Sequence, residues 1–312
     1  MKSFSILLKP FFAIVIIAIL LGILFSALFL SPVSSQAAAP KLATERSDVQ
    51  SPLKFQKVVL VLMDGLRSDS LVSCEHPLVD ELMSHSLYTL KGVTVLPSIT
   101  LSAHFSLFHS VTPQRHGILS NTYVPPANPV KGLFEVLRAE GKTSAMFYSW
   151  EELRDLARPD SLTYSFYFSG NYLGYEKTNS FCVASFLDFL ATHGQPDFTF
   201  LYLGWPDSAG HSSGWMTPEY FRAVRGSLDL LKSVLEVLPD DTLVIFTADH
   251  GGHDNSHGSD LPEDMTIPVF LYNRRLDSAE LPAARIIDLA PTAAAVLGVE
   301  VDSDWEGTNL LR

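Results

Sequence analysis

The chain has 312 residues, of which 47% are hydrophobic and 18% are charged, and this composition allows a single domain with one large buried core. Its formal net charge is -12, from 22 basic and 34 acidic residues. An excess of acidic side chains repels phosphates, so the composition argues against a protein that binds nucleic acid polymers.

The N-terminal segment is strongly apolar. Residues 11–30 form a predominantly apolar run. Lys2 and Lys9 lie before this run, and small residues around Ala37 lie after it. This pattern predicts that residues 1–37 are either a cleaved signal peptide or an N-terminal membrane anchor. Either one leads the chain out of the cytoplasm, so the expected location is extracytoplasmic: periplasmic, secreted or anchored by one span. Residues 38–56 are typical of a linker, and we expect the folded domain over residues 57–312.

The rest of the chain alternates between strand-like and helix-like patterns. Glycine or proline residues mark the breaks between them. Strands that alternate with helices form a mostly parallel sheet covered on both faces, so the pattern predicts an α/β fold. Buried aliphatic runs predict strands at residues 57–65, 143–149, 197–205, 242–251 and 267–273. Helical patterns lie at residues 132–141, 179–194 and 218–239.

Acidic and histidine side chains follow three of the predicted strands. Asp64 ends the first of these strands, Asp207 follows the third, and Asp249 and His250 follow the core of the fourth. In parallel sheets, ligands bind beyond the carboxyl ends of the strands. We therefore expect these residues to share one site.

Two local motifs give these residues the chemistry of metal ligands. In ADHGG the strand ends at Asp249 and His250, and two glycines supply the turn that lets both side chains face one pocket. In PDSAGH, Asp207 and His211 lie four residues apart, on one helical turn or in a tight loop. Carboxylates and imidazoles are ligands that zinc accepts, and the whole set is large enough for two divalent cations.

A hydroxyl nucleophile is expected beside such a metal pair. Thr100 lies directly before an apolar, helix-like run, where free backbone N–H groups can hold a phosphate oxygen. Ser98 or Thr100 is also suited to cap this helix, and capping is compatible with the role of nucleophile. Ser102 is the local alternative as nucleophile, and His104 is either a hydrogen-bond donor behind the site or a packing residue.

In this order and spacing, the motifs resemble those of the alkaline phosphatase superfamily, in particular its type I phosphodiesterase/nucleotide pyrophosphatase branch. The resemblance covers nearly all of residues 57–312. It rests on VVLVLMDGLR, LPSIT with the later TPQRHGI, PDSAGH, TADHGG with the later HG, and the tail IIDLAPTAAAVLGV followed by DWEG. It implies an alkaline phosphatase-like three-layer sandwich, in which a mostly parallel central sheet has helices on both faces.

The resemblance also implies two divalent metal ions, with Zn²⁺ preferred. One ion is expected to bind Asp64, Thr100, Asp249 and His250. Thr100 is then the catalytic nucleophile, which attacks phosphorus in line and forms a phosphothreonine intermediate that water hydrolyses.

The second ion is expected to bind Asp207, His211 and one further histidine. His257 is preferred as that third ligand, because related enzymes place it in an HG pair after the DHG turn. His253 is the alternative. No histidine follows His257 in the sequence, so the loop after the DHG turn has to supply this ligand.

The segment around the nucleophile departs from the family pattern. The Asn that contacts the phosphate in nucleotide phosphodiesterases is matched here by Ala103, so we expect the metals and the backbone to stabilise the transition state. His109-Ser110 replaces the usual Thr-Gly after the nucleophile helix, which is expected to change how this helix packs. The Cys and Arg of the sulfatase motif are absent from LPSITLSAH, so a sulfatase is disfavoured.

The expected function is hydrolysis of phosphodiester or pyrophosphate bonds in a small substrate, either a nucleotide or another diester. Three alternatives stay open. The first is a phosphomonoesterase of the same superfamily. The second is a catalytically silent envelope protein that keeps the fold, and the third is a membrane transferase that moves a phospho-headgroup. The sequence does not indicate the oligomeric state.

Three further features leave alternatives. The aromatic segment Tyr164–Tyr175 is either a specificity loop that stacks on a base or aryl group of the substrate, or a segment that packs in the core or at the rim of the site. The packing role is favoured. Arg67 is the nearest candidate for a residue that binds the phosphate of a monoester, and a surface role is favoured for it. Cys74 and Cys182 either pair in an oxidising compartment or stay as two buried thiols.

Overall fold

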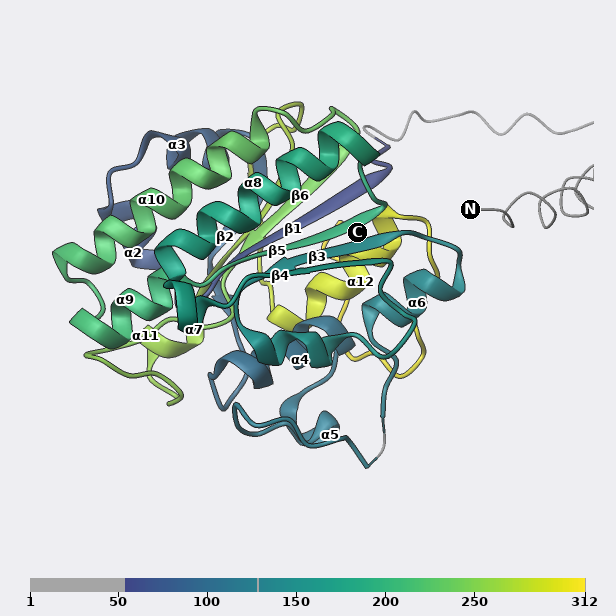
Figure 1. Ribbon diagram of the computed structural model, residues 1–312, viewed down its shortest axis with the longest axis horizontal. Coiled ribbons are helices and arrows are strands. Elements are labelled where there is room, and N and C mark those ends of the chain that lie inside the picture. Colours follow the sequence, from purple (N-terminus) through teal and green to yellow (C-terminus); the bar gives the residue numbers. More distant parts are fainter. Residues whose placement is uncertain (1–53, 128, 312) are drawn as a thin grey trace, which may run out of the picture. The chain divides into compact units, whose positions relative to one another are not determined.

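The computed structural model describes residues 54–127 and 129–311 (Figure 1). The predicted signal peptide or anchor at residues 1–37, and most of the linker at residues 38–56, lie outside the described residues. Within the described part, no helix has the length and apolar character needed to cross a membrane. Regular structure begins with a strand at Lys57.

An eight-stranded mixed sheet forms the centre of the domain. The strands are β1 (Lys57–Met63), β2 (Ser86–Val93), β3 (Ser144–Tyr148), β4 (Tyr164–Tyr167), β5 (Phe198–Leu203), β6 (Thr242–Thr247), β7 (Thr266–Tyr272) and β8 (Ala279–Glu280). Their order is β4-β3-β5-β1-β6-β7-β2-β8. The central strand β1 pairs in parallel with β5 and with β6. Only β7 runs antiparallel to its neighbours in the described sheet, so the sheet is mostly parallel, as predicted.

Helices cover both faces of this sheet, which confirms the predicted three-layer α/β architecture (Figure 1). One face carries α2 (Ser68–Ser73), α3 (Pro77–Ser84), α8 (Tyr175–His193), α9 (Trp205–Ser213) and α10 (Pro218–Leu235). The other carries α4 (Thr100–His109), α5 (Pro113–His116), α6 (Leu133–Ala139) and α12 (Leu289–Val296). The short helices are α7 (Gly170–Leu173), α11 (Pro262–Met265), η1 (Glu151–Leu156) and η2 (Ile286–Asp288).

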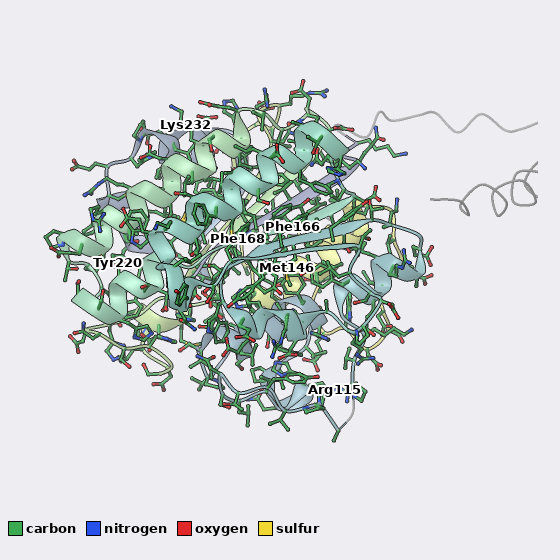
Figure 2. The ribbon with its side chains drawn as sticks, in the orientation of Figure 1. Arg115, Met146, Phe166, Phe168, Tyr220 and Lys232 are labelled. Carbon is green, nitrogen blue, oxygen red and sulfur yellow. The ribbon has the colours of Figure 1, made fainter. Side chains whose placement is uncertain are left out.

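Helix α10 shows how the sequence directs this packing. The side chain of Thr217 accepts a hydrogen bond from Tyr220 N and so caps the helix. The buried hydroxyl of Tyr220 (Figure 2) donates to Gly65 O at 2.9 Å and fastens α10 to the turn after β1. Residues at three- and four-residue spacing point to the sheet, and burial of each contributes about 1.5–3 kcal/mol. This buried stripe is Tyr220, Val224, Leu228, Leu231 and Leu235.

The predicted elements are recovered, but three strands were not predicted. The five aliphatic runs form β1, β3, β5, β6 and β7, and the helical patterns form α6, α8 and α10. The unpredicted strands are β2, β4 and β8. The segment Tyr164–Tyr175 is not a loop, because it contains β4, α7 and the start of α8. Phe166 (Figure 2) stacks on Phe147 with ring centroids 4.7 Å apart, so part of this segment packs against the sheet.

The pair His109-Ser110 closes α4 by hydrogen bonds and stacking. Ser110 has a left-handed backbone with φ of 52°. Its Oγ donates to Ile287 O at 2.7 Å and accepts from Gly307 N at 3.1 Å. The ring of His109 stacks on Phe105 at 4.9 Å. The helix therefore keeps a defined end, and that end is tied to the C-terminal segment.

Cys74 and Cys182 are buried as free thiols. Cys182 lies within α8, and Cys74 is the C-cap of α2. Burial raises the pKa of both thiols, that of Cys182 to about 12. The structure thus favours two protonated core thiols over a disulfide.

Ser110→Ala is expected to lower the free energy of unfolding by about 1–3 kcal/mol, because it leaves a buried carbonyl without its donor. Urea denaturation followed by circular dichroism measures the change. Ser180→Ala, at an exposed position of α8, is the control and should stay within about 0.5 kcal/mol of the wild type. Equal stability of both variants would show that Ser110 does not anchor α4.

Candidate active site

The strands β5, β1 and β6 lie side by side, and the residues that follow them carry the predicted carboxylates. Asp64 directly follows β1, and Asp249 lies just beyond β6. Asp207 lies in the first turn of α9, which follows β5. Because adjacent parallel strands end at the same edge, three carboxylates from distant parts of the sequence meet there.

Glycines let the segments of this edge approach each other closely. Gly65 has φ of +68°, and a Cβ at this position would lie 2.9 Å from Asp207 Cα. Its N–H donates to Asp249 Oδ1 at 3.2 Å. At Gly251 a Cβ would overlap Glu263 O, and its φ is not positive. This glycine is therefore needed for the close approach of the chain at Glu263, because any side chain would overlap that carbonyl.

Thr100 and three of the predicted residues converge on one point. Thr100 is the first residue of α4, and Ile99 is the N-cap, so the hydroxyl of Thr100 is not used for capping. Its Oγ1 lies 3.2 Å from His250 Nε2. The same nitrogen lies 3.3 Å from Asp64 Oδ1 and 3.3 Å from Asp249 Oδ2.

A second group forms beside the first. His211 Nε2 lies 3.1 Å from His257 Nε2 and 3.5 Å from Asp207 Oδ1. His257 Nε2 lies 3.8 Å from the same carboxylate oxygen. His253 is not in this group, because its Nδ1 donates to Asp264 Oδ1 at 2.7 Å. The structure thus brings together the preferred set and leaves the alternative histidine outside it.

The three histidines of the site are oriented in the same way. Each ring donates its Nδ1–H to a backbone carbonyl, which leaves the Nε2 lone pair directed at the site. This is how proteins orient imidazoles that bind metals. The three bonds are His211 to Asn255 O at 3.1 Å, His250 to Gly251 O at 2.8 Å and His257 to Ser98 O at 2.9 Å.

The three carboxylates lack partners that would neutralise them. One oxygen of each is shielded from solvent and has no hydrogen-bond partner among the described residues: Asp64 Oδ1, Asp207 Oδ1 and Asp249 Oδ2. Burial raises the pKa of Asp64, and repulsion by the other two carboxylates raises it further. Burial likewise raises the pKa of Asp249, to about 8. Divalent cations would satisfy these oxygens and remove the repulsion, so the residues fit metal ions.

The site opens into a cavity of about 420 Å³. Two of its lining residues, Asn171 and Tyr175, come from the aromatic segment Tyr164–Tyr175 that the sequence offered as a specificity segment. The lining residues that were not predicted are Asn121, Trp150, Tyr202, Ser208 and Ser212. The hydroxyl of Tyr202 donates a short hydrogen bond to Asp64 Oδ2, which fixes this carboxylate.

Asn121 is a site residue that the sequence did not reveal. Its Oδ1 accepts a hydrogen bond from Leu101 N at 3.0 Å, which places the side chain at the start of α4. Its NH₂ group makes no hydrogen bond to another described residue and is available to a ligand in the cavity. Ala103 is fully buried in α4. The cavity thus contains, besides the backbone and the predicted metal ligands, the amide of Asn121.

The remaining candidates lie away from the cavity. Ser102 is fully buried and does not line it. Arg67 donates to Asp69 and to Gly252 O, so its guanidinium holds a loop and is not free to clamp a phosphate. His104 donates from Nδ1 to Thr100 O at 2.8 Å and also packs in the core, so it has both predicted roles. Burial lowers its pKa to about 3, which keeps the ring neutral.

The arrangement of the sheet and its helices is an alkaline phosphatase-like fold, which solved structures share. Human ectonucleotide pyrophosphatase/phosphodiesterase 5 has a TM-score of 0.67 at 16% identity, over 81% of this chain and 97% of that chain. The phosphonate monoester hydrolase of Agrobacterium radiobacter has a TM-score of 0.65 at 14% identity, over 82% of this chain and 76% of that chain. At such identities the likeness shows the fold alone.

The chain belongs to the type I phosphodiesterase/nucleotide pyrophosphatase family, whose model matches residues 58–281. This confirms the resemblance seen in the motifs. Mouse ectonucleotide pyrophosphatase/phosphodiesterase family member 1 is 25% identical over 228 residues, which are 65% of this chain and 25% of that protein. The catalytic subunit of mouse GPI ethanolamine phosphate transferase 3 is 24% identical over 275 residues, 80% of this chain and 25% of that protein. The chain spans about a quarter of the length of these curated relatives.

The loop that carries His257 is held by Asp264, a second residue that the sequence did not reveal. The buried carboxylate of Asp264 accepts from Ser259 N at 2.9 Å, Ser259 Oγ at 2.7 Å and His253 Nδ1 at 2.7 Å. Its backbone carbonyl accepts from Gly251 N at 2.9 Å. Burial alone would raise the pKa of Asp264, but the bonds from His253 and Ser259 lower it overall, so the group is ionised.

Asp264→Asn is expected to lower the affinity for Zn²⁺ by about 10- to 100-fold, because groups that orient metal ligands typically contribute this much. Isothermal titration of the metal-free protein with Zn²⁺ measures it. Asp260→Asn, at an exposed position of the same loop, is the matched control. Equal affinities of the two variants would contradict a role of Asp264 in placing His257.

Proposed function

We propose that the chain hydrolyses phosphodiester or pyrophosphate bonds in small substrates with the help of two divalent metal ions, preferably Zn²⁺. One observation carries the proposal: unpartnered carboxylate oxygens and imidazole Nε2 atoms converge beside the hydroxyl of Thr100. The family supports the same chemistry, and a solved structure of the murine ectonucleotide pyrophosphatase/phosphodiesterase 5 contains AMP. The substrate is accordingly a nucleotide or another small diester.

The two groups of side chains support the predicted ligand sets. One ion would be held by Asp64, Thr100, Asp249 and His250, whose side chains meet at His250 Nε2. The other would be held by Asp207, His211 and His257. Bound there, the ions would favour ionisation of a hydroxyl or water and offset negative charge on the leaving oxygen.

The proposed reaction consists of two successive displacements at phosphorus. The Oγ1 of Thr100 attacks phosphorus in line, the bond to the leaving oxygen breaks, and the threonine proton ends on the departing alcohol. Water then cleaves the phosphothreonine, which restores the hydroxyl and releases the phosphomonoester. The NH₂ group of Asn121 and the N–H of Thr100, which has no partner within the helix, donate to the non-bridging oxygens.

A diester is a better fit than a monoester. A monoester carries a second negative charge, and Arg67, the nearest predicted clamp, is engaged with Asp69. The retention of every predicted ligand and of the nucleophile favours an active enzyme over a silent envelope protein. We propose an extracytoplasmic location on the basis of the apolar run at residues 11–30.

Thr100→Ala is expected to reduce hydrolysis of bis-p-nitrophenyl phosphate by at least about a thousandfold, since it removes the nucleophile. The bound zinc, measured by mass spectrometry, should stay near about two ions per chain, because the carboxylates and histidines remain. Ser102 carries the alternative nucleophilic hydroxyl, so Ser102→Ala is the control and should stay active. If Ser102→Ala lost activity and Thr100→Ala kept it, the nucleophile would be Ser102 and not Thr100.

Asn121→Asp is expected to lower kcat by about 100- to 1000-fold, the usual loss for a donor to a developing oxyanion. This change keeps the acceptor for Leu101 N but removes the NH₂ donor, so the start of α4 should stay intact. The exposed neighbour Thr122 provides the control variant, Thr122→Ala. An unchanged kcat in Asn121→Asp would exclude the amide from transition-state binding.

A further inference from the structure

The loop that carries Asn121 has few contacts of its own. Its residues from Leu119 to Thr122 are exposed. In the part of the chain that the structure describes, no backbone–backbone hydrogen bond holds residues 118–124. An amide that donates to a transition state needs a fixed position, because a displacement of about 1 Å can lower the rate about a hundredfold. The position of Asn121 therefore depends on the side chains that hold the ends of this loop.

His116 holds the first end of the loop. It is the last residue of α5, and its ring is buried. Its Nδ1 accepts a hydrogen bond from Ile118 N at 3.0 Å. Only an unprotonated ring nitrogen can accept such a bond, so the proton of the neutral ring lies on Nε2. Burial lowers the pKa of His116 to about 4, which keeps the ring in this neutral form at neutral pH.

The other nitrogen of His116 connects the loop to the helix of the nucleophile. Its Nε2–H donates to Ser106 Oγ at 2.9 Å. Ser106 is fully buried in α4, the helix that begins at Thr100, and α5 packs against this helix (Figure 1). One imidazole thus bonds both to the backbone of the loop and to the nucleophile helix.

Phe105, the neighbour of Ser106 in α4, packs against both ends of the same loop. The centroid of its ring lies 5.8 Å from that of His116 and 5.6 Å from that of Tyr123, on which it stacks. Tyr123 lies two residues after Asn121. One turn of α4 therefore holds the chain before and after Asn121.

We infer that His116 is a positioning residue, which fixes Asn121 relative to the hydroxyl of Thr100 by joining its loop to α4. The inference rests on the proposed phosphodiesterase function, and it gives a role to the motif TPQRHGI, which the predicted ligands and nucleophile leave unexplained. His116 does not line the cavity, so it acts on the reaction through Asn121. Its removal should lower kcat and leave the metal ligands in place.

A double-mutant cycle in the full chain tests the coupling between His116 and Asn121. His116→Ala should lower kcat for bis-p-nitrophenyl phosphate by about 10- to 100-fold, with KM and zinc content nearly unchanged. In the Asn121→Asp background the same change should cost less than about twofold, because the donor that His116 positions is already missing. An unchanged kcat in His116→Ala, or losses that multiply in the double variant, would overturn the inference.

Two smaller changes isolate the bond between His116 and α4. His116→Asn keeps an acceptor for Ile118 N, because asparagine side chains bond to the backbone two residues further on, but it is too short to reach Ser106. Ser106→Ala removes the partner in α4. Each variant should lower kcat about two- to tenfold, and their combination should lower it no further than either one. A wild-type kcat in both variants contradicts the inference.

His109→Asn is the matched control. His109 is also buried and also contacts Phe105. Its Nδ1 donates to Phe105 O within α4, and no hydrogen bond joins it to residues 116–124 among the described residues. This variant should have a lower free energy of unfolding but a wild-type kcat per folded molecule. If His116→Ala gave the same result, the role of His116 would be structural only and the inference would fail.

Hydrogen exchange distinguishes failure of this inference from failure of the proposed function. If the wild type does not hydrolyse bis-p-nitrophenyl phosphate, the phosphodiesterase function fails, and exchange measured by mass spectrometry tests the loop directly. His116→Ala should speed exchange over residues 117–123, and His109→Asn should not. Faster exchange in His116→Ala alone supports the fastening of the loop by His116, and equal exchange in the two variants overturns it.

Discussion

Electrostatic repulsion among three closely spaced carboxylates is the constraint on which the rest of this structure depends. Asp64 and Asp249 are buried and Asp207 is partly buried, and one oxygen of each has no partner among the described residues. Such an arrangement is unfavourable by itself, because desolvated like charges raise each other's pKa. Backbone carbonyls turn the Nε2 lone pairs of three imidazoles toward the same place, so these rings offer no proton to the unpartnered oxygens. The arrangement therefore suits the positive charge of the proposed divalent cations.

The strands that could be predicted from the sequence are those whose residues are all buried. The strands β1, β5 and β6 are buried on both faces and read as continuous aliphatic runs. Helix α10 could be predicted from the apolar residues that recur along one of its faces. The missed strands lie near the edges of the sheet, where exposure is mixed: β4 is mostly exposed, and β8 has only two residues. β8 is too short to carry a pattern, and the alternation at β4 does not extend beyond a few residues. Pairing with a neighbouring strand therefore decides their structure.

The convergence of the candidate residues could be predicted where they lie within a short motif. PDSAGH and ADHGG each place an acidic residue and a histidine within a few residues of each other, and strand order then brings the motifs together. Contacts across long separations were not visible: Tyr202 reaches Asp64 over 138 residues, and Asn121 reaches Leu101 over 20 residues. The choice between His253 and His257 depended on Asp264, which engages the first of them from 11 residues further along the chain.

The contact between Gly65 N and Asp249 spans 184 residues, and this separation bears on how the protein folds. Contacts between distant segments form late, because the chain must first lose the entropy of closing the intervening loop. In the unfolded chain the carboxylates are far apart, so no high-affinity site exists for an ion to organise. The proposed metal ions would therefore slow unfolding and raise the melting temperature, without accelerating the search for the native topology.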